Sequence, residues 1–182
     1  MDLPGAFFKS PRNRICRTLV LMWLCSLGCR TSGVPETFET TVRRLDTPEK
    51  LADWMDNKII LVSKYGAFPG PQQVQETFRT KRGNCADVAA LAFHVLAVHG
   101  YGPHIMTIQV SSDIRMNHAL CVFFQNGGLY ALDNGKLRGP YRNLETIASN
   151  HHQDWSEYHI YNSLENFIVT HVADVSKIRN VR

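Results

Sequence analysis

Apolar residues recur at helical spacing in two stretches near the start of the folded part of the chain. Asp46-Thr47-Pro48-Glu49 has the N-cap candidate, the proline and the following acid of a helix start. The apolar stripe behind it comprises Leu51, Trp54, Met55, Ile59 and Val62. This pattern predicts a helix that ends at about Lys64. A shorter stripe predicts a second helix over residues 72–80.

The most continuous helical pattern begins at Cys85 and runs to about His99. Its apolar stripe comprises Val88, Leu91, Ala92, Val95 and His99. Asn84 is a favourable N-cap and Gly100 is a typical helix stop. The many alanines of this segment indicate close packing on several sides.

Strand patterns dominate the second half of the chain. Residues 104–110, 118–125 and 129–133 are rich in apolar and β-branched side chains. Asn126-Gly127 between the last two is a strong hairpin signal. A short helix is predicted over residues 143–150, and further strands over 158–161 and 167–172. Helices followed by an antiparallel sheet indicate an α+β fold, with the N-terminal helices packed on the sheet.

Composition and charge place this fold in one domain behind a basic N-terminus. The chain has 182 residues, of which 44% are apolar, which suffices for one buried core. Residues 1–28 carry four basic residues and one acid, so three of the four net positive charges lie there. The folded part is nearly neutral, which argues against a nucleic-acid partner.

The N-terminus has the parts of an export signal. A basic stretch ends at Arg17, and an apolar run too short to span a bilayer comfortably follows over residues 18–27. Ser26-Leu27-Gly28-Cys29 resembles a bacterial lipoprotein processing box, in which the cysteine becomes the lipidated N-terminus. We therefore expect an export segment over 1–28, a tether over 29–45 and a domain over 46–182. The predicted location is the periplasm or the membrane surface, with attachment through a lipidated Cys29. Another cleaved signal, an uncleaved anchor or a buried segment remain alternatives.

Cys85 is the leading candidate for chemistry. A cysteine reacts as its thiolate, and the N–H groups and positive dipole end of a helix N-terminus favour that anion. Gly83 in front of it would let a substrate approach the backbone closely.

The hairpin predicts a partner pair for this thiol. With Asn126-Gly127 as the loop, Leu120 lies opposite Asp133. His118 is two residues from Leu120 and therefore on the same face. His118 and Asp133 are then diagonal neighbours, about 7–8 Å apart at the backbone and within reach of an imidazole and a carboxylate.

The same alternation places Cys121 on the opposite face of its strand from His118. Cys121 is therefore expected to be a small buried residue, and a disulfide between Cys85 and Cys121 is disfavoured.

Three segments together resemble the core of the transglutaminase-like superfamily. They are Gly83-Asn84-Cys85-Ala86-Asp87, Asn117-His118-Ala119 and Tyr130-Ala131-Leu132-Asp133. Members typically show a G-x-C-x-D segment that opens a helix, then a histidine that begins one strand and an aspartate on the next. The resemblance covers about residues 46–140. It implies a papain-like α+β fold, a Cys-His-Asp triad of Cys85, His118 and Asp133, and kinship with bacterial cysteine peptidases of the envelope. In several relatives a side chain assists the oxyanion, and the candidates here are Trp54, Gln72 and Gln75.

These observations predict a thiol-dependent amide-bond enzyme that forms an acyl-enzyme on a protein or peptide. Water as the acceptor gives a cysteine peptidase or amidase, an amine gives transglutaminase-like transfer, and we favour water. No cofactor is predicted, and the pair His151-His152 comes with no recognisable metal-ligand spacing. The alternative hypothesis is a non-catalytic module of the same fold that binds a peptide or protein at the envelope.

Overall fold

The computed structural model describes residues 36–62, 71–111 and 117–168. The export segment, Cys29 and most of the predicted tether lie outside these residues. Within them, no helix combines the length and the apolar character that a bilayer span requires.

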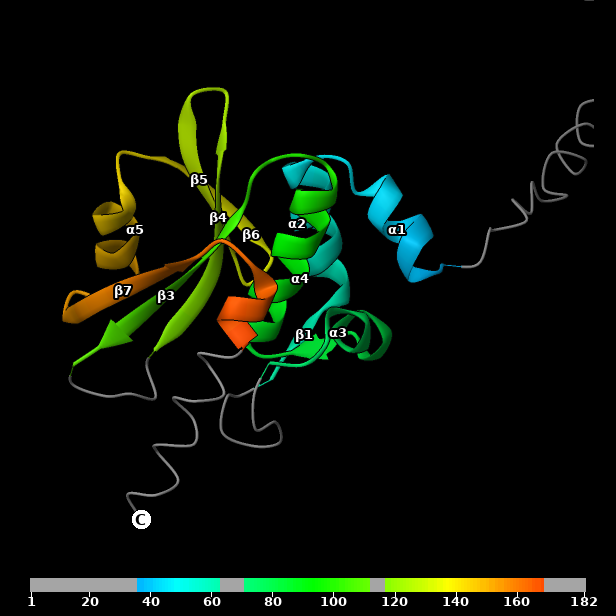
Figure 1. Cartoon of the computed structure of the whole chain (residues 1–182), viewed down its shortest axis with the longest axis horizontal. Coiled ribbons are helices and arrows are strands. Elements are labelled where there is room, and N and C mark those ends of the chain that lie inside the picture. The colour runs from blue at the N-terminus through cyan, green and yellow to red at the C-terminus, as the bar shows by residue number, and fades with distance from the viewer. Residues whose placement is uncertain (1–35, 63–70, 112–116, 169–182) are drawn as a thin grey trace, which may run out of the picture. The chain divides into compact units, whose positions relative to one another are not determined.

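The N-terminal part consists of three helices and a short two-stranded sheet (Figure 1). In chain order these are α1 (Phe38–Arg44), α2 (Pro48–Lys58), β1 (Ile60–Leu61), α3 (Val74–Thr80) and β2 (Arg82–Gly83). α1 lies in the segment expected to be a tether, and Thr37 forms a capping box with Thr40 at its start. The compact unit accordingly begins at Thr37.

α2 ends at Lys58, so the prediction that it runs to about Lys64 was wrong. Ile59 has extended backbone angles. Ile60 then donates its N–H to the carbonyl of Lys81 at 2.8 Å, and Val62 donates to that of Gly83 at 3.0 Å. β-branched residues suit a strand, and this pairing with β2 outweighs the helical spacing of the apolar stripe.

α4 (Cys85–Val98) is the central helix of the fold. Its bounds match the prediction to one residue, and the helix is buried on most of its circumference. Gly100 follows it with a φ of +77°, a conformation that favours glycine after a helix.

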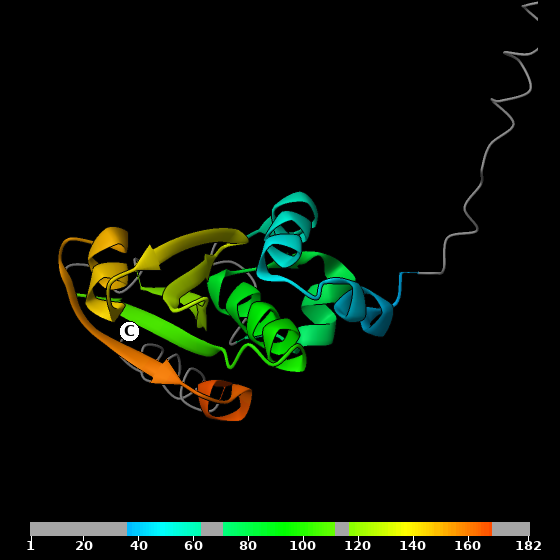
Figure 2. The same ribbon diagram turned by 90° about the horizontal axis from the view of Figure 1, so that it is seen from above.

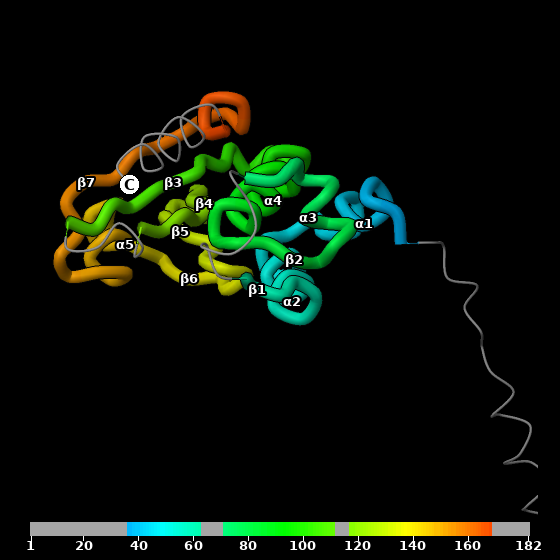
Figure 3. The backbone as a smooth tube through the Cα atoms, turned by 90° about the horizontal axis from the view of Figure 1, so that it is seen from below, coloured from blue at the N-terminus to red at the C-terminus, as the bar shows by residue number. Residues whose placement is uncertain are grey.

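Five antiparallel strands form the main sheet in the order β6-β5-β4-β3-β7, which Figure 3 shows from one side to the other. They are β3 (His104–Val110), β4 (His118–Gln125), β5 (Gly128–Asp133), β6 (Lys136–Tyr141) and β7 (Trp155–Tyr161). Gln125 pairs with Gly128, and Asn126 and Gly127 have φ values of +51° and +77°. The predicted hairpin is therefore confirmed, with its register. β6 was not predicted.

Each face of the sheet is covered by a different helix, as Figures 1 and 2 show. α4 packs on the face that carries Ala119, Cys121, Phe123 and Leu132. α5 (Leu144–His151) packs on the other face, where Ile147 and Ala148 contact Leu120, Val122 and Ala131. His118 alternates with the residues of β4 that face α5, whereas Cys85 is the first residue of α4. Side chains from these two layers can contact one another at the end of the sheet.

The prediction of a strand over residues 167–172 was wrong for the two residues of this range that the structure describes. Phe167 lies in a helical turn, with its N–H donated to the carbonyl of Ser163 at 3.2 Å. Its ring is fully buried, with its centroid 5.5 Å from that of Tyr161. Residues 169–172 lie outside the described part of the chain.

Cys121 is fully buried in the α4 face, and neither Cys121 nor Cys85 forms a disulfide within the described part of the chain. This confirms the predicted parity of β4 and agrees with the expectation that the two cysteines do not pair. Burial raises the pKa of the Cys121 thiol, which therefore stays protonated and unreactive.

We expect Cys121→Ser to lower the free energy of unfolding by about 1–3 kcal/mol, because it buries a hydroxyl among apolar side chains. Urea unfolding measures the effect. Cys85→Ser is the matched control: it makes the same atomic change at a helix start, where serine is well tolerated. Equal losses for the two variants would contradict the structural role of Cys121.

Candidate active site

Asn84 fixes the start of α4 and with it the position of Cys85. Its side-chain oxygen accepts the backbone N–H groups of Ala86 at 2.8 Å and Asp87 at 3.1 Å. The Asp87 carboxylate in turn accepts the N–H of Asn84 at 2.8 Å, which completes a capping box. Cys85 is thereby the first helical residue, at the positive end of the helix dipole.

Asp87 also ties a second segment to this helix start. It is fully buried, and it accepts the backbone N–H of Gln72 at 2.6 Å and the Gln72 side-chain amide at 3.3 Å. Gly83 lies against the same side chain: a Cβ at this position would stand 2.7 Å from the Asp87 Cβ. The glycine is thus required by packing inside the protein, a reason that the sequence did not reveal.

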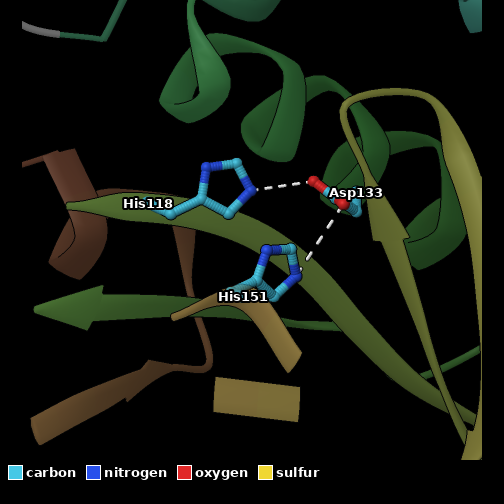
Figure 4. A group of neighbouring side chains, drawn as sticks. All are labelled: His118, Asp133 and His151. Atoms are coloured by element: carbon cyan, nitrogen blue, oxygen red, sulfur yellow. Dashed lines mark hydrogen bonds and ion pairs between the residues drawn. The ribbon is translucent and has the colours of Figure 1, made fainter. Parts of the chain in front are cut away.

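His118 and Asp133 form the pair that the hairpin parity predicted. Cys121 pairs with Leu132 in the β4–β5 ladder, and continuing this register puts Leu120 opposite Asp133. The Nε2 atom of His118 lies 2.8 Å from Oδ1 of Asp133 (Figure 4). The predicted pairing of these two side chains is confirmed.

His118 also interacts with Cys85. Burial of the imidazole lowers its pKa, but hydrogen bonds with Asp133 and Cys85 and the negative charges of both partners outweigh burial and raise the pKa to about 9. Because Nε2 is engaged by Asp133, Nδ1 is the atom left to face the sulfur. The structure therefore brings the three predicted residues together in the order Cys85, His118, Asp133.

Asp133 is held as a carboxylate by its neighbours. Burial alone would raise its pKa, yet the hydrogen bond from His118 and the charges of His118, His151 and Arg138 keep the pKa below its usual range. Arg138 on β6 donates its Nε–H to Oδ2 at 3.2 Å. Asp133 pairs with Lys136, so Arg138 is a diagonal neighbour on the same face.

The turn after Asp133 packs closely against α2. Asn134 and Gly135 have φ values of +48° and +85° and connect β5 to β6. A Cβ on Gly135 would lie 3.0 Å from the Met55 Cβ and 3.1 Å from the Asp56 nitrogen. This contact fixes the end of β5, and with it the position of the carboxylate.

His151 is a site residue that the sequence analysis missed. It is the last residue of α5, and its ring centroid lies 4.7 Å from that of His118 at an interplanar angle of 32°. Its Nε2 is 3.8 Å from Oδ2 of Asp133 (Figure 4). Burial lowers the pKa of His151, the Asp133 charge raises it, and the neighbouring cations lower it, with a net decrease. The available signal was the adjacent pair His151-His152 after a predicted helix.

The three candidates for oxyanion assistance lie in different surroundings. Trp54 is buried, stacked on Phe78 with centroids 5.7 Å apart, and covered by the Lys81 ammonium. Gln75 is exposed on α3. Gln72 contacts the first turn of α4, because its side-chain amide donates to Asp87 at 3.3 Å.

A cavity of about 210 Å³ adjoins the imidazole of His118. Its lining residues among those described are Ile108, Val110, His118, His151 and His152. The same region contains a potential metal-ligand set, since the ligand atoms of His118, Asp133 and His151 all lie within 4.8 Å of one another.

This chain is similar to several solved structures and matches one family model. Solved structures similar to this chain include Legionella pneumophila LapG, at 16% identity and a TM-score of 0.41, with 50% of this chain and 54% of that chain covered. EGTA-treated LapG matches at 15% identity and a TM-score of 0.44, with 65% and 67% covered. A proposed cysteine protease from Cytophaga hutchinsonii matches at 14% and 0.42, with 66% and 50% covered.

The chain spans about half the length of the first of these solved proteins. No curated protein matches the chain. The family model described as DUF553, a transglutaminase-like domain, matches residues 37–143, which contain Cys85, His118 and Asp133. This match covers more than half of the sequence, and the chain therefore belongs to the transglutaminase-like domain family.

Proposed function

We propose that this protein is a thiol-dependent amide-bond enzyme in which Cys85 is the nucleophile, His118 the proton shuttle and Asp133 the residue that orients His118. The observation that carries the proposal is the position of one imidazole between a thiol at a helix start and a buried carboxylate. This arrangement has the three roles of a nucleophile, its base and the orienter of that base.

In the first step the Cys85 thiolate attacks the carbonyl carbon of an amide. The helix dipole and the protonated His118 ring favour the thiolate before substrate binds. Asp133 holds the ring through Nε2, so that the Nδ1 proton faces the sulfur and then the departing nitrogen. His118 gives this proton to the leaving amine as the C–N bond breaks, and the acyl group stays on sulfur as a thioester.

In the second step an acceptor attacks the thioester while His118 takes up its proton, and the C–S bond breaks to release the Cys85 thiolate. Because His118 must contact both the leaving group and the acceptor, these groups lie beside its ring, which lines the cavity of about 210 Å³. The described residues that line this cavity include no carboxylate to attract a lysine ammonium group. We therefore favour water as the acceptor, hence a peptidase or amidase acting on a protein or peptide.

We also propose that the enzyme acts at the cell envelope, because residues 1–28 have the pattern of an export signal that ends at a lipoprotein-type cysteine. Expressed as the full chain in a bacterium, the protein should enter the membrane fraction and incorporate labelled fatty acid. Cys29→Ala should abolish the label, whereas Cys25→Ala should retain it. An unlabelled wild-type protein would contradict attachment through Cys29.

Alkylation by iodoacetamide at mildly acidic pH tests the thiol directly. We expect Cys85 to react at least about tenfold faster than free cysteine, whose pKa leaves little thiolate there. His118→Ala should remove this advantage, and Asp133→Asn should reduce it. Mass spectrometry of tryptic peptides separates Cys85 from Cys121, which should stay unlabelled.

The binding-module hypothesis makes the opposite forecast for the same measurement. Under it, Cys85 reacts no faster than free cysteine, and Cys85→Ala retains the biological activity of the wild type. That pair of results would end the enzyme proposal.

The pH profile should show a loss of kcat/KM above pH about 9. The pKa of His118 is raised to about 9, so the imidazolium that protonates the leaving group is present below this pH and disappears above it. Asp133→Asn removes the carboxylate that helps to raise this pKa and should move the alkaline limb to lower pH. A limb that Asp133→Asn leaves in place would contradict the assignment to His118.

A further inference from the structure

The α5 face of the sheet brings two imidazoles and one carboxylate together from three separate elements. His118 comes from β4, Asp133 from β5 and His151 from α5. Nε2 of His118 is 2.8 Å from Oδ1 of Asp133, and Nε2 of His151 is 3.8 Å from Oδ2. All three side chains are mostly buried, with exposed fractions of 18%, 11% and 16%. This cluster includes His151, for which the proposed reaction has no role.

We propose that His118, Asp133 and His151 form a binding site for a divalent transition-metal ion of the zinc class, and that occupation of this site inhibits the enzyme. The inhibition rests on the proposed function, whereas the metal binding does not. The substrate-facing thiol of Cys85 is not part of this ligand set.

The donor set selects the class of metal. Two imidazole nitrogens and one carboxylate oxygen suit zinc and cobalt, and three protein ligands with an open fourth position are common for zinc. Calcium and magnesium prefer oxygen ligands in larger number. A site with two imidazoles therefore discriminates against both of these hard cations.

The three ligand atoms lie within 4.8 Å of one another, so binding a metal requires side-chain adjustments. Zinc–ligand bonds of about 2.0–2.1 Å at tetrahedral angles place neighbouring ligand atoms about 3.3 Å apart. The 2.8 Å contact must open slightly and the 3.8 Å contact must close slightly, which side-chain rotation can provide. The cavity of about 210 Å³ beside His118 and His151 has room for a water at the fourth position.

Arg138 is the group that competes with a metal. Its Nε–H contacts Oδ2 of Asp133 at 3.2 Å, but its side chain is 51% exposed and can turn into solvent. The Arg138 guanidinium therefore pairs with the Asp133 carboxylate, and a metal ion can displace it. Removing the guanidinium should strengthen metal binding.

The metal would interfere with the proton shuttle at a defined atom. It takes the lone pair of His118 Nε2, and the proton that Nε2 shares with Asp133 leaves to solvent. The ring then keeps its remaining proton on Nδ1, and loss of that proton would leave a metal-bound imidazolate. His118 becomes a weaker acid toward the leaving amine, so turnover slows although the metal does not bind the thiol.

The test uses the full chain with Cys85→Ala, so that no active-site thiolate can bind the metal. Titration with cobalt should give one equivalent bound, with the strong visible bands of tetrahedral cobalt and without a sulfur-to-cobalt charge-transfer band. Zinc should displace the cobalt. Proton NMR of the cobalt form should show hyperfine-shifted N–H signals from two imidazoles, a measurement that needs no change at His151.

Variants in the same background separate this site from its surroundings. His151→Gln should weaken zinc binding at least about tenfold. Removing a residue that only hydrogen-bonds to a metal ligand already costs about tenfold or more, and His151 is a proposed ligand itself. His152→Gln is the matched control: this neighbouring imidazole lines the same cavity but pairs with Asp154 at 2.7 Å, and its variant should keep the wild-type affinity. Arg138→Gln should bind zinc more tightly.

Three results would overturn the proposal. They are cobalt binding that appears only when Cys85 is present, an unchanged affinity in His151→Gln, and an equal loss in His152→Gln. Because binding is measured without turnover, an inactive wild-type protein would count against the proposed function alone. Active protein that fails to bind cobalt would count against the metal site alone.

Discussion

The candidate site depends on one hydrogen bond, between Nε2 of His118 and the carboxylate of Asp133. This bond crosses the β4–β5 ladder, so its length is set by the register of the hairpin and by the turn at Asn126-Gly127. It fixes which ring nitrogen remains for Cys85, and it keeps the imidazole charged to high pH. A sheet that slipped by one residue would turn one of these side chains to the α4 face and break the arrangement.

Much of this arrangement could be predicted because it follows from local rules. The asparagine-glycine turn determines which residues of the two strands lie opposite each other, and alternation along a strand determines which face each side chain occupies. An asparagine before an apolar helical pattern marks the start of the helix. These rules predicted from the sequence the His118–Asp133 pair and the burial of Cys121. The approach of Cys85 to His118 followed no local rule. It depends on how α4 lies against the sheet, and only the family resemblance indicated it.

The parts that escaped prediction are those that long-range packing decides. Ile60 joins a strand because β2, far along the chain, offers a free edge, although its spacing fits a helix. The strand that carries Arg138 was missed even though Asn134-Gly135 repeats the signal used one hairpin earlier, because residues 136–141 include a lysine, a glycine and a proline, residue types that are depleted in strands. His151 enters the site because α5 folds over the sheet, and no motif in its own segment contains that information.

The packing of Gly135 on α2 makes a residue without a side chain a determinant of how the candidate site is aligned. Even a methyl group there would have to push the hairpin tip away from Met55 and Asp56, and the strand end that carries the carboxylate would move with it. The position of Asp133 relative to His118 therefore depends partly on the packing of α2. Relatives of this domain should therefore keep a glycine here as strictly as they keep His118 and Asp133.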